Sequence, residues 1–238
     1  MHYFILIVLA PLFILQGKRV KRSAPKLAEA QGERAGQSGQ GKPFSLLIFG
    51  DSAAAGVGVE HQSKALLGVV TQSLAELYQV NWRLLAKSGY NTEKALRMLK
   101  KELVARPELQ LDAVVVSLGV NDVLSPLSAK TWIKQQRMLV ELLTQQTGCQ
   151  RLIITRVPPM GDFPLLPQPL RWFLGKRSQE FNRHLARYVA SEPRCTLLDF
   201  GEQLDSKAMA TDGFHPGAVI YQDWGKAAAK AILQHKQV

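Results

Sequence analysis

The sequence has few cysteines and no group of residues with the spacing of a metal site. Only two of the 238 residues are cysteine, Cys149 and Cys195, and neither belongs to a cluster of Cys, His and carboxylate residues. The sequence therefore requires no metal, and we expect no cofactor. Each cysteine comes just before an expected strand. The two thiols would be close enough for a disulfide if those strands are neighbours, and two reduced, packed thiols are the alternative.

No apolar run is long enough to cross a bilayer without help. The longest extends from Tyr3 to Leu15 and is followed by Lys18-Arg19-Val20-Lys21-Arg22, whereas a spanning helix needs about 20 apolar residues. A cleaved signal is disfavoured, because no Lys or Arg precedes the run and the small-residue site Ala28-Glu29-Ala30 lies too far downstream. We therefore expect residues 1–22 to form an uncleaved membrane anchor.

By the positive-inside rule, the basic residues after this run predict that the domain that follows them is cytoplasmic. This position favours reduced thiols over a disulfide. The alternative is an atypical export signal, which would leave the domain periplasmic or secreted. Large apolar residues are nearly absent from positions 23–43, so we expect a flexible linker there. Residues 44–238 are long enough for one α/β domain.

The sequence also lacks nucleic-acid and nucleotide motifs. Its net charge of +11 comes largely from the N-terminal basic cluster and from scattered positions such as Lys94 and Lys101. No zinc-finger, RNA-recognition or helix-turn-helix pattern accompanies this charge, so we expect no nucleic-acid partner. Gly50, Gly56 and Gly58 do not form a dinucleotide-binding motif, and no Lys-Ser or Lys-Thr pair follows them.

Short apolar runs alternate with segments of helical periodicity. The alternation of strand and helix predicts right-handed crossovers and a parallel sheet between two helical layers. The expected fold class is therefore α/β, a three-layer α/β/α sandwich with a five-stranded parallel sheet in the flavodoxin-like order. The expected strands are Ser45–Phe49, Trp82–Ala86, Ala113–Leu118, Arg151–Arg156 and Thr196–Asp199.

Chemically capable residues follow several of these strands. Ligands bind beyond the carboxyl ends of strands in an open parallel sheet, so these residues should meet at one edge. The blocks are Gly50-Asp51-Ser52, Ser88-Gly89-Tyr90-Asn91, Gly119-Val120-Asn121-Asp122 and Asp212-Gly213-Phe214-His215-Pro216. Taken singly, Ser52 is typical of a helix N-cap and Asn121 of a turn that caps its own backbone.

Together the four blocks resemble the SGNH hydrolases, also called the GDSL esterase/lipase family, from about Phe44 to the C-terminus. The resemblance implies that Ser52 is the nucleophile and that Asp212 and His215 complete a catalytic triad. It also implies an oxyanion hole formed by Ser52, Gly89 and Asn121. Ala53 stands where the family's Gly-Asp-Ser-Leu block has Leu, which bears on pocket shape more than on mechanism.

The two aspartates beside these residues, Asp51 and Asp122, are expected to hold loops by hydrogen bonds to the backbone. After the fourth expected strand, a proline-rich apolar stretch runs from Val157 to Leu174. We expect it to line an acyl pocket or touch the bilayer, with packing on the core as the alternative. The predicted pocket residues are Met160, Phe163, Leu170, Trp172 and Phe173.

The sequence thus predicts a membrane-tethered serine esterase that hydrolyses acyl esters through an acyl-enzyme. Its substrate would be a small-molecule ester, such as a lysophospholipid or another lipid-like ester. An acyltransferase, a carbohydrate acetylesterase and a membrane-tethered binding module without turnover are the alternatives. The sequence does not predict an oligomeric state.

Overall fold

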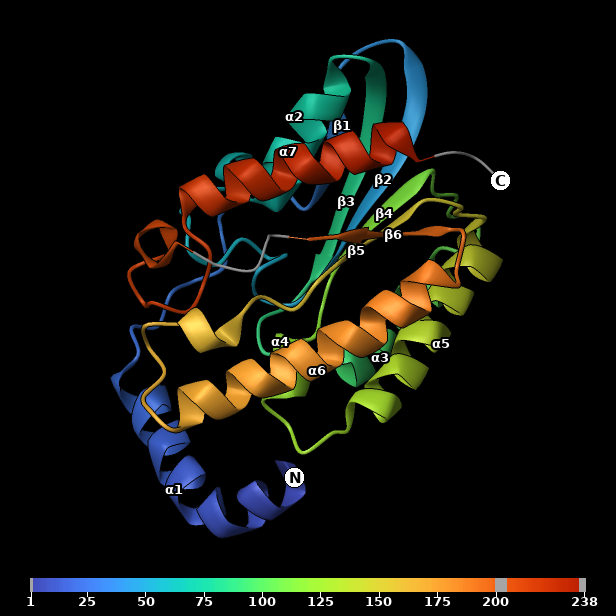
Figure 1. Ribbon diagram of the computed structural model, residues 1–238. Helices are drawn as coiled ribbons and strands as arrows, with labels where there is room; N and C mark the ends of the chain where they lie inside the picture. The colour runs from blue at the N-terminus through green and yellow to red at the C-terminus, as the bar shows by residue number, and fades with distance from the viewer. Residues whose placement is uncertain (1, 200–204, 236–238) are drawn as a thin grey trace.

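A computed structural model describes residues 2–199 and 205–235 of the chain. Its sheet has six strands in the order β1-β3-β2-β4-β5-β6 (Figure 1). The last five are parallel, in the expected flavodoxin-like order. The strands are β1 (Ala35–Ser38), β2 (Lys42–Gly50), β3 (Tyr78–Ala86), β4 (Ala113–Ser117), β5 (Leu152–Thr155) and β6 (Cys195–Leu198).

Two layers of helices cover the sheet, which confirms the three-layer α/β/α fold. One face is covered by α2 (Leu66–Ala75) and α7 (Ala218–Gln234), and the other by α3 (Thr92–Ala105), α5 (Ala129–Thr147) and α6 (Leu170–Ala190) (Figure 1). The central strands are apolar on both faces because both faces are buried. In β2, for example, Leu47 and Phe49 join the α3–α5–α6 core, whereas Leu46 and Ile48 join the α2–α7 core.

The sheet has one strand more than the sequence predicted. The additional strand, β1, pairs antiparallel with the edge of β3, in a register that joins Ala35 to Arg83. Residues 35–38 therefore belong to the sheet and are not the flexible tether that was expected for residues 23–43. The tether prediction followed from composition, but an edge strand pairs through backbone groups and needs little apolar sequence.

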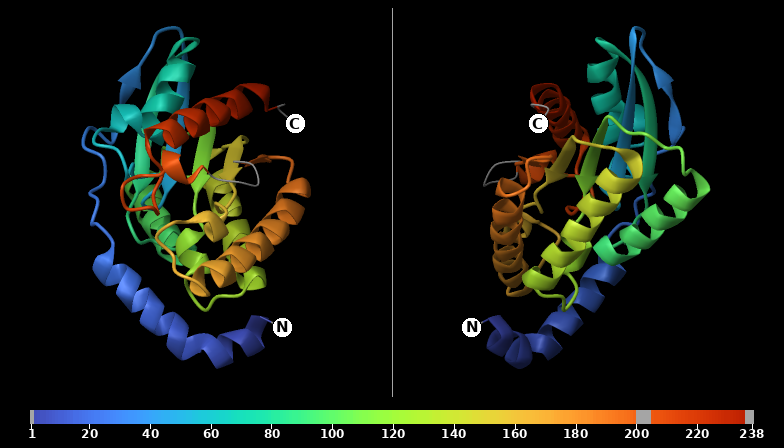
Figure 2. Two further views of the ribbon diagram at one scale, coloured as in Figure 1. Left: turned by 60° about the vertical axis from the view of Figure 1, so that its left-hand side comes forward. Right: turned by 90° about the vertical axis from the view of Figure 1, so that its right-hand side faces the viewer.

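An N-terminal helix, α1 (His2–Ser23), runs along the outside of the domain near the start of α6 (Figure 2). Phe13 of this helix is buried, and its ring stacks on Phe173 of α6 at a centroid distance of 4.7 Å. Gln16 adds two hydrogen bonds, donating to the carbonyl of Gln168 and accepting from the amide of Leu170. In the part of the chain that the structure describes, no helix is both long enough and apolar enough to span a membrane.

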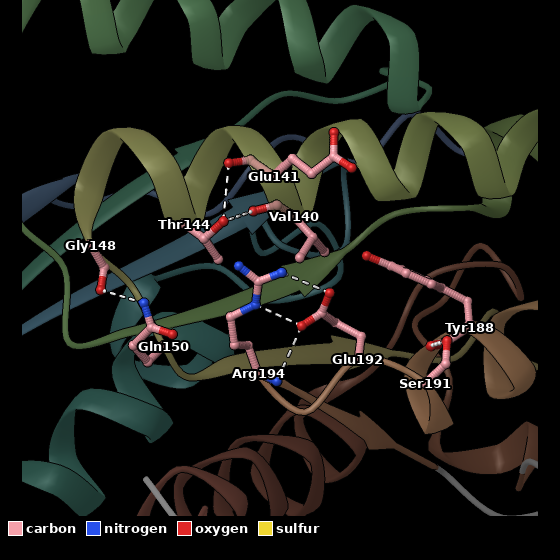
Figure 3. Close-up of polar contacts among 9 residues, drawn as sticks. All are labelled: Val140, Glu141, Thr144, Gly148, Gln150, Tyr188, Ser191, Glu192 and Arg194. Atoms are coloured by element: carbon pink, nitrogen blue, oxygen red, sulfur yellow. Dashed lines mark hydrogen bonds and ion pairs between the residues drawn. The ribbon is translucent and has the colours of Figure 1, made fainter. Parts of the chain in front are cut away.

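Local polar contacts lie just before the amino ends of β5 and β6 (Figure 3). Glu192 and Arg194, just before β6, form an ion pair with an Nε–Oε1 distance of 2.6 Å. The two cysteines near this edge, Cys149 and Cys195, are buried free thiols, as the sequence analysis favoured. Burial raises the pKa of Cys149 to about 11 and that of Cys195 to about 12, so neither is a reactive thiolate. The opposite edge carries the candidate site.

Candidate active site

Ser52 lies in the turn directly after β2, at the carboxyl edge of the sheet. Its neighbour Gly50 has no room for a side chain, because a Cβ there would be 2.2 Å from the carbonyl oxygen of Ser117 on β4. The turn is closed by bonds from the amide of Ala55 to the carbonyl of Asp51 and from the amide of Val57 to the carbonyl of Ser52. These bonds fix the backbone that presents the Ser52 hydroxyl.

His215 and Asp212 reach Ser52 from the turn that precedes α7. The Oγ of Ser52 is 3.0 Å from Nε2 of His215, and Nδ1 of His215 is 2.6 Å from Oδ2 of Asp212. The other carboxylate oxygen of Asp212 accepts from the backbone amides of Phe214 and His215, each at 3.0 Å. The three side chains therefore form a continuous hydrogen-bonded chain from carboxylate to hydroxyl.

Asp212 is buried, yet its pKa is lowered. Burial by itself would raise the pKa of this carboxyl, but the hydrogen bonds from the His215 ring and from the two backbone amides lower it below its usual value. Asp212 is therefore ionised at neutral pH and fixes Nδ1 of His215 as a donor. Nε2 of His215 is then free to accept the hydroxyl proton of Ser52.

Two backbone amides at the site have no intramolecular acceptor in the part of the chain that the structure describes. Among the described residues, neither the amide of Ser52 nor that of Gly89 donates a hydrogen bond to another part of the chain. Gly89 lies between β3 and α3 with φ of +75°, a conformation that favours glycine, and a Cβ there would meet nothing within 4 Å. Both amides are available to bind a negatively charged oxygen.

Asn121 lies on α4 (Val120–Val123), and its side-chain amide already has two partners. Its Nδ2 is 2.9 Å from the carbonyl oxygen of Tyr90 and 3.3 Å from Oδ2 of Asp51. The first bond connects α4 to the loop that carries Gly89. To bind a ligand oxygen, the amide must give up one of the two partners, and the longer contact to Asp51 is the weaker one.

Asp51 is the most perturbed carboxyl group at the site. It is 2% exposed, and its Oδ1 accepts from the amide of Ala53 at 3.1 Å. Burial raises its pKa to about 7, with a smaller contribution from the charge of Asp122, against the opposing effects of the Ala53 amide and of His215. Asp51 therefore holds the backbone beside Ser52, as the sequence analysis expected.

Other polar contacts fix the loops around the site. Both oxygens of Asp122 accept from the amide of Thr92, and Oδ2 also accepts from the Thr92 hydroxyl at 2.9 Å. On the other side, the hydroxyl of Tyr221 on α7 is 2.9 Å from the carbonyl oxygen of Ala53 and 2.8 Å from that of Val57. Sequence patterns did not identify Tyr221 as a residue of the site. Its helical spacing predicts burial and gives no signal for its contact with the nucleophile turn.

An apolar pocket opens beside Ser52 and His215. Arg156 is the only Lys or Arg residue in its described lining, and Asp51 is the only carboxylate. Most of the lining comes from the segments that follow β4 and β5 and from the region of α7. The apolar lining residues are Ala53, Leu118, Val120, Val157, Pro158, Phe163, Met209, Phe214, Pro216, Ile220 and Trp224.

The five residues predicted to form a substrate pocket have different environments. Phe163 lines the pocket beside Ser52, and its ring packs edge-on against Phe214, next to His215. Met160, Leu170 and Phe173 are buried in the α3–α5–α6 core, which corresponds to the packing alternative. Trp172 is 43% exposed and does not line the pocket. The proline-rich stretch from 157 to 174 therefore contacts the site mainly through residues 157–163.

The described residues contain no group of three His, Cys, Asp or Glu side chains arranged to hold a metal ion. Among the remaining histidines, His61 has its Nδ1 3.0 Å from the hydroxyl of Ser63. This exposed pair has the serine–histidine distance of the candidate site but no carboxylate partner in the described contacts. It offers a natural comparison for Ser52 and His215.

Comparison with known proteins is consistent with this arrangement. The model of the GDSL-like lipase/acylhydrolase family matches residues 48–222. Comparison with curated proteins finds no match.

Solved structures share the fold at low sequence identity. A lipase, Lip_vut3, from a goat rumen metagenome has a TM-score of 0.67 and 19% identity over 82% of this chain and 99% of its own. TesA has a TM-score of 0.63 and 21% identity over 79% of this chain and 97% of its own. A carbohydrate esterase family 2 enzyme from Corynascus thermopiles (Myceliophthora fergusii) has a TM-score of 0.63 and 18% identity over 87% and 68% of the two chains.

Proposed function

The chain belongs to the GDSL-like lipase/acylhydrolase family, a family of ester hydrolases, and we propose that it hydrolyses acyl esters with Ser52 as the nucleophile. The observation that carries the proposal is the hydrogen-bonded chain from Asp212 through His215 to Ser52, with distances of 2.6 and 3.0 Å. These distances fit a base that accepts the hydroxyl proton and a carboxylate that orients the base.

The reaction proceeds in two halves. In the first, Oγ of Ser52 attacks the ester carbonyl while Nε2 of His215 takes the hydroxyl proton, and the imidazolium returns this proton to the departing alcohol. In the second, His215 takes a proton from water, the resulting hydroxide attacks the acyl-enzyme, and Ser52 recovers its proton as the acid leaves. The ionised Asp212 stabilises the imidazolium in both halves.

The negative charge on the carbonyl oxygen is bound by the amides of Ser52 and Gly89, which have no intramolecular acceptor in the described structure. Asn121 supplies a third donor. Its amide turns from Asp51 to the oxyanion while it keeps the 2.9 Å bond to the carbonyl of Tyr90. This exchange costs little, because the 3.3 Å contact to Asp51 is long and charge on the oxyanion strengthens the new bond.

The apolar lining of the pocket beside Ser52 favours an acyl chain as the group that binds there. Lipid-like esters, including lysophospholipids, fit this chemistry better than acetylated sugars, which need several polar partners at the site. Transfer of the acyl group to an alcohol instead of water uses the same acyl-enzyme. Product analysis with an added alcohol acceptor distinguishes the two reactions.

A fluorophosphonate probe, which reacts only with an activated serine, tests the proposal. We expect the wild type to be labelled and Ser52→Ala not to be labelled. Ser63→Ala is the matched control, because Ser63 also lies 3.0 Å from a histidine nitrogen. It should be labelled like the wild type. Equal labelling of Ser52→Ala and the wild type would refute Ser52 as the nucleophile, and no labelling of either would favour a binding module without turnover.

We also propose that the N-terminal segment holds the enzyme at a membrane surface. Ile14 and Leu15 on α1 are 58% and 65% exposed, and Leu12 is exposed beside them. A basic cluster follows on the same helix (Lys18, Arg19, Lys21 and Arg22). Exposed apolar side chains next to basic ones fit an anionic membrane surface. The cytoplasmic leaflet is anionic, so this cluster favours a cytoplasmic catalytic domain.

Co-sedimentation with vesicles that contain phosphatidylglycerol tests this second proposal. We expect the wild type to sediment with the vesicles and a variant with Leu12, Ile14 and Leu15 replaced by Asp to remain in the supernatant. Equal sedimentation of the two proteins would refute the membrane-surface role of these residues. Esterase activity on a soluble substrate, measured in the same variant, shows whether the catalytic domain is intact.

A further inference from the structure

The segment between α1 and β2 folds along the edge of the domain and reaches the candidate site. Its strand β1 pairs with β3, and just before β1 the carbonyl of Arg34 accepts from the amide of Leu84. The preceding residues then run past the carboxyl end of β3, where the loop with Gly89 begins. None of these residues falls within the part of the chain that the family model matches, which begins at residue 48.

Glu29 and Arg34 form a small network on this loop. Oε1 of Glu29 accepts from the backbone amide of Ser88 at 2.8 Å, and Oε2 is 2.9 Å from a guanidinium nitrogen of Arg34. The guanidinium also donates a short hydrogen bond to the carbonyl of Ala86, the last residue of β3. The pair thus holds the backbone at both Ala86 and Ser88, directly before Gly89.

The same segment contacts the turn that carries Ser52. The amide of Ala30 donates to the carbonyl of Ala55 at 3.3 Å. The side chain of Gln62 connects the two by donating to the carbonyls of Ala30, at 3.1 Å, and Ala55, at 2.9 Å. Ala30 is buried in this contact. One short stretch of chain therefore touches both loops whose free amides face the proposed oxyanion.

The loop with Gly89 has little packing of its own. Lys87, Ser88 and Gly89 are exposed, and the open space around the Gly89 Cα leaves its backbone without side-chain contacts on that side. The loop is held mainly by four hydrogen bonds. Two are within the backbone, from the amide of Lys87 to the carbonyl of Gly50 and from the amide of Tyr90 to the carbonyl of Lys87. The other two use side chains: the amide of Ser88 donates to the carboxylate of Glu29, and the side-chain amide of Asn121 donates to the carbonyl of Tyr90. Among the bonds on the amino-terminal side of Gly89, the one to Glu29 is the nearest in the sequence.

From these contacts we propose that Glu29 is a positioning residue for the reaction: through the amide of Ser88 it holds the amide of Gly89 in place for the oxyanion. The inference rests on the proposed esterase function. A donor displaced by a fraction of an ångström binds the transition state less well while the substrate still binds in the pocket. Glu29 therefore affects kcat and not KM.

The charge state of Glu29 agrees with this role. Its partial burial would raise its pKa, but the hydrogen bonds from Ser88 and the charge of Arg34 lower it below the usual value. The side chain is an ionised acceptor at neutral pH, and a charged acceptor forms the stronger hydrogen bond.

The test compares Glu29→Ala and Glu29→Gln with the wild type in full-length protein. We expect Glu29→Ala to lower kcat for a p-nitrophenyl ester about tenfold, the effect of one charge-assisted hydrogen bond, with KM unchanged. The labelling rate with a fluorophosphonate should fall in parallel, because that reaction also places an oxygen in the oxyanion hole. Glu29→Gln keeps an acceptor for the Ser88 amide and should recover part of the rate.

Glu192→Ala is the matched control, because it removes an equivalent ion pair with Arg194 at the opposite edge of the sheet (Figure 3). It should leave kcat unchanged. If Glu29→Ala has the kcat of the wild type, or if KM alone changes, the positioning role is refuted. If Glu29→Ala lowers the melting temperature markedly, the Glu29→Gln variant decides the question. The positioning role is supported if Glu29→Gln melts like the wild type and its kcat lies between those of Glu29→Ala and the wild type. The role is refuted if Glu29→Gln has the kcat of the wild type. Failure of the esterase proposal is distinguishable, because the wild type itself would then show no labelling that depends on Ser52.

Discussion

Replacing Asp51 by asparagine should change how the stability of the protein depends on pH. Asp51 is 2% exposed beside Ser52, and burial raises its pKa from the ordinary 3.8 to about 7. Below pH 4 the carboxyl is protonated in both the folded and the unfolded protein. As the pH rises from about 4 to about 7, the unfolded chain loses the proton while the folded protein keeps it, so the free energy of unfolding falls.

The size of the effect follows from the difference between the two pKa values. Each pH unit between them costs about 1.4 kcal/mol of stability. Between pH 5 and pH 7 the wild type should therefore lose on the order of 2 kcal/mol that Asp51→Asn does not lose. The lowered pKa values of Asp212 and Glu29 act in the opposite sense. The stability that they contribute is present above their unfolded pKa values, near 4, and is lost only as the pH falls further.

Urea denaturation of both proteins at pH 5, 6, 7 and 8 measures the effect. The quantity of interest is the difference in unfolding free energy between Asp51→Asn and the wild type, which should shift in favour of the variant as the pH rises and level off above about pH 7. Any fixed cost of placing an amide next to Asn121 cancels in this comparison. Glu192→Gln is the control: hydrogen bonds from Arg194 lower the pKa of Glu192, so its carboxyl is ionised in the folded protein throughout this pH range and the difference should stay nearly constant. A difference that also stays constant for Asp51→Asn would refute the assignment of a raised pKa to this group.

Two further substitutions test the catalytic chain and the pocket. Asp212→Asn should lower kcat on the order of 10³-fold or more with little change in KM, because an amide no longer fixes Nδ1 of His215 as a donor or stabilises the imidazolium. Steady-state kinetics measure this loss. A loss in kcat below tenfold would contradict the proposed role of Asp212. Phe163→Ala removes a pocket wall beside Phe214 and should raise kcat/KM for long acyl esters relative to short ones by about tenfold. The exposed Trp172→Ala is its control, and a chain-length profile that is identical for the two variants and the wild type would remove Phe163 from the acyl pocket.

The parallel core of the fold was predictable because strands that are buried on both faces appear in the sequence as continuous apolar runs. The expected strand Ala113–Leu118 differs from β4 by one residue, and Arg151–Arg156 extends β5 by one residue at each end. The carboxyl ends of these strands were predictable for the same reason. The sequence therefore also predicted that Ser52, Asn121 and His215 lie at the same edge of the sheet. Position along a parallel strand carries information about the site because every strand ends at the same edge.

The elements that the sequence did not reveal are those whose partners are distant or whose sequence is polar. Strand β1 has the sequence Ala-Gly-Gln-Ser and is bound by backbone hydrogen bonds to β3, more than 40 residues away. Helix α6 begins at Leu170, inside the proline-rich stretch that was expected to line an acyl pocket, and Leu170 and Phe173 are buried in the core. Apolar content predicts that such residues are buried, but it does not distinguish a core from a substrate pocket.

The proposed role of Glu29 would extend the catalytic unit beyond the boundary of the family match. The match begins at residue 48, so it includes the loop with Gly89 but not Glu29. The loop with Gly89 is nevertheless held by a carboxylate 59 residues earlier in the chain. For the proposed reaction, the amide of Gly89 must be available to bind the oxyanion, and the residues on either side of Gly89 must hold it in position. In this chain, part of that support comes from residues 23–43, which composition alone predicts to be a flexible linker.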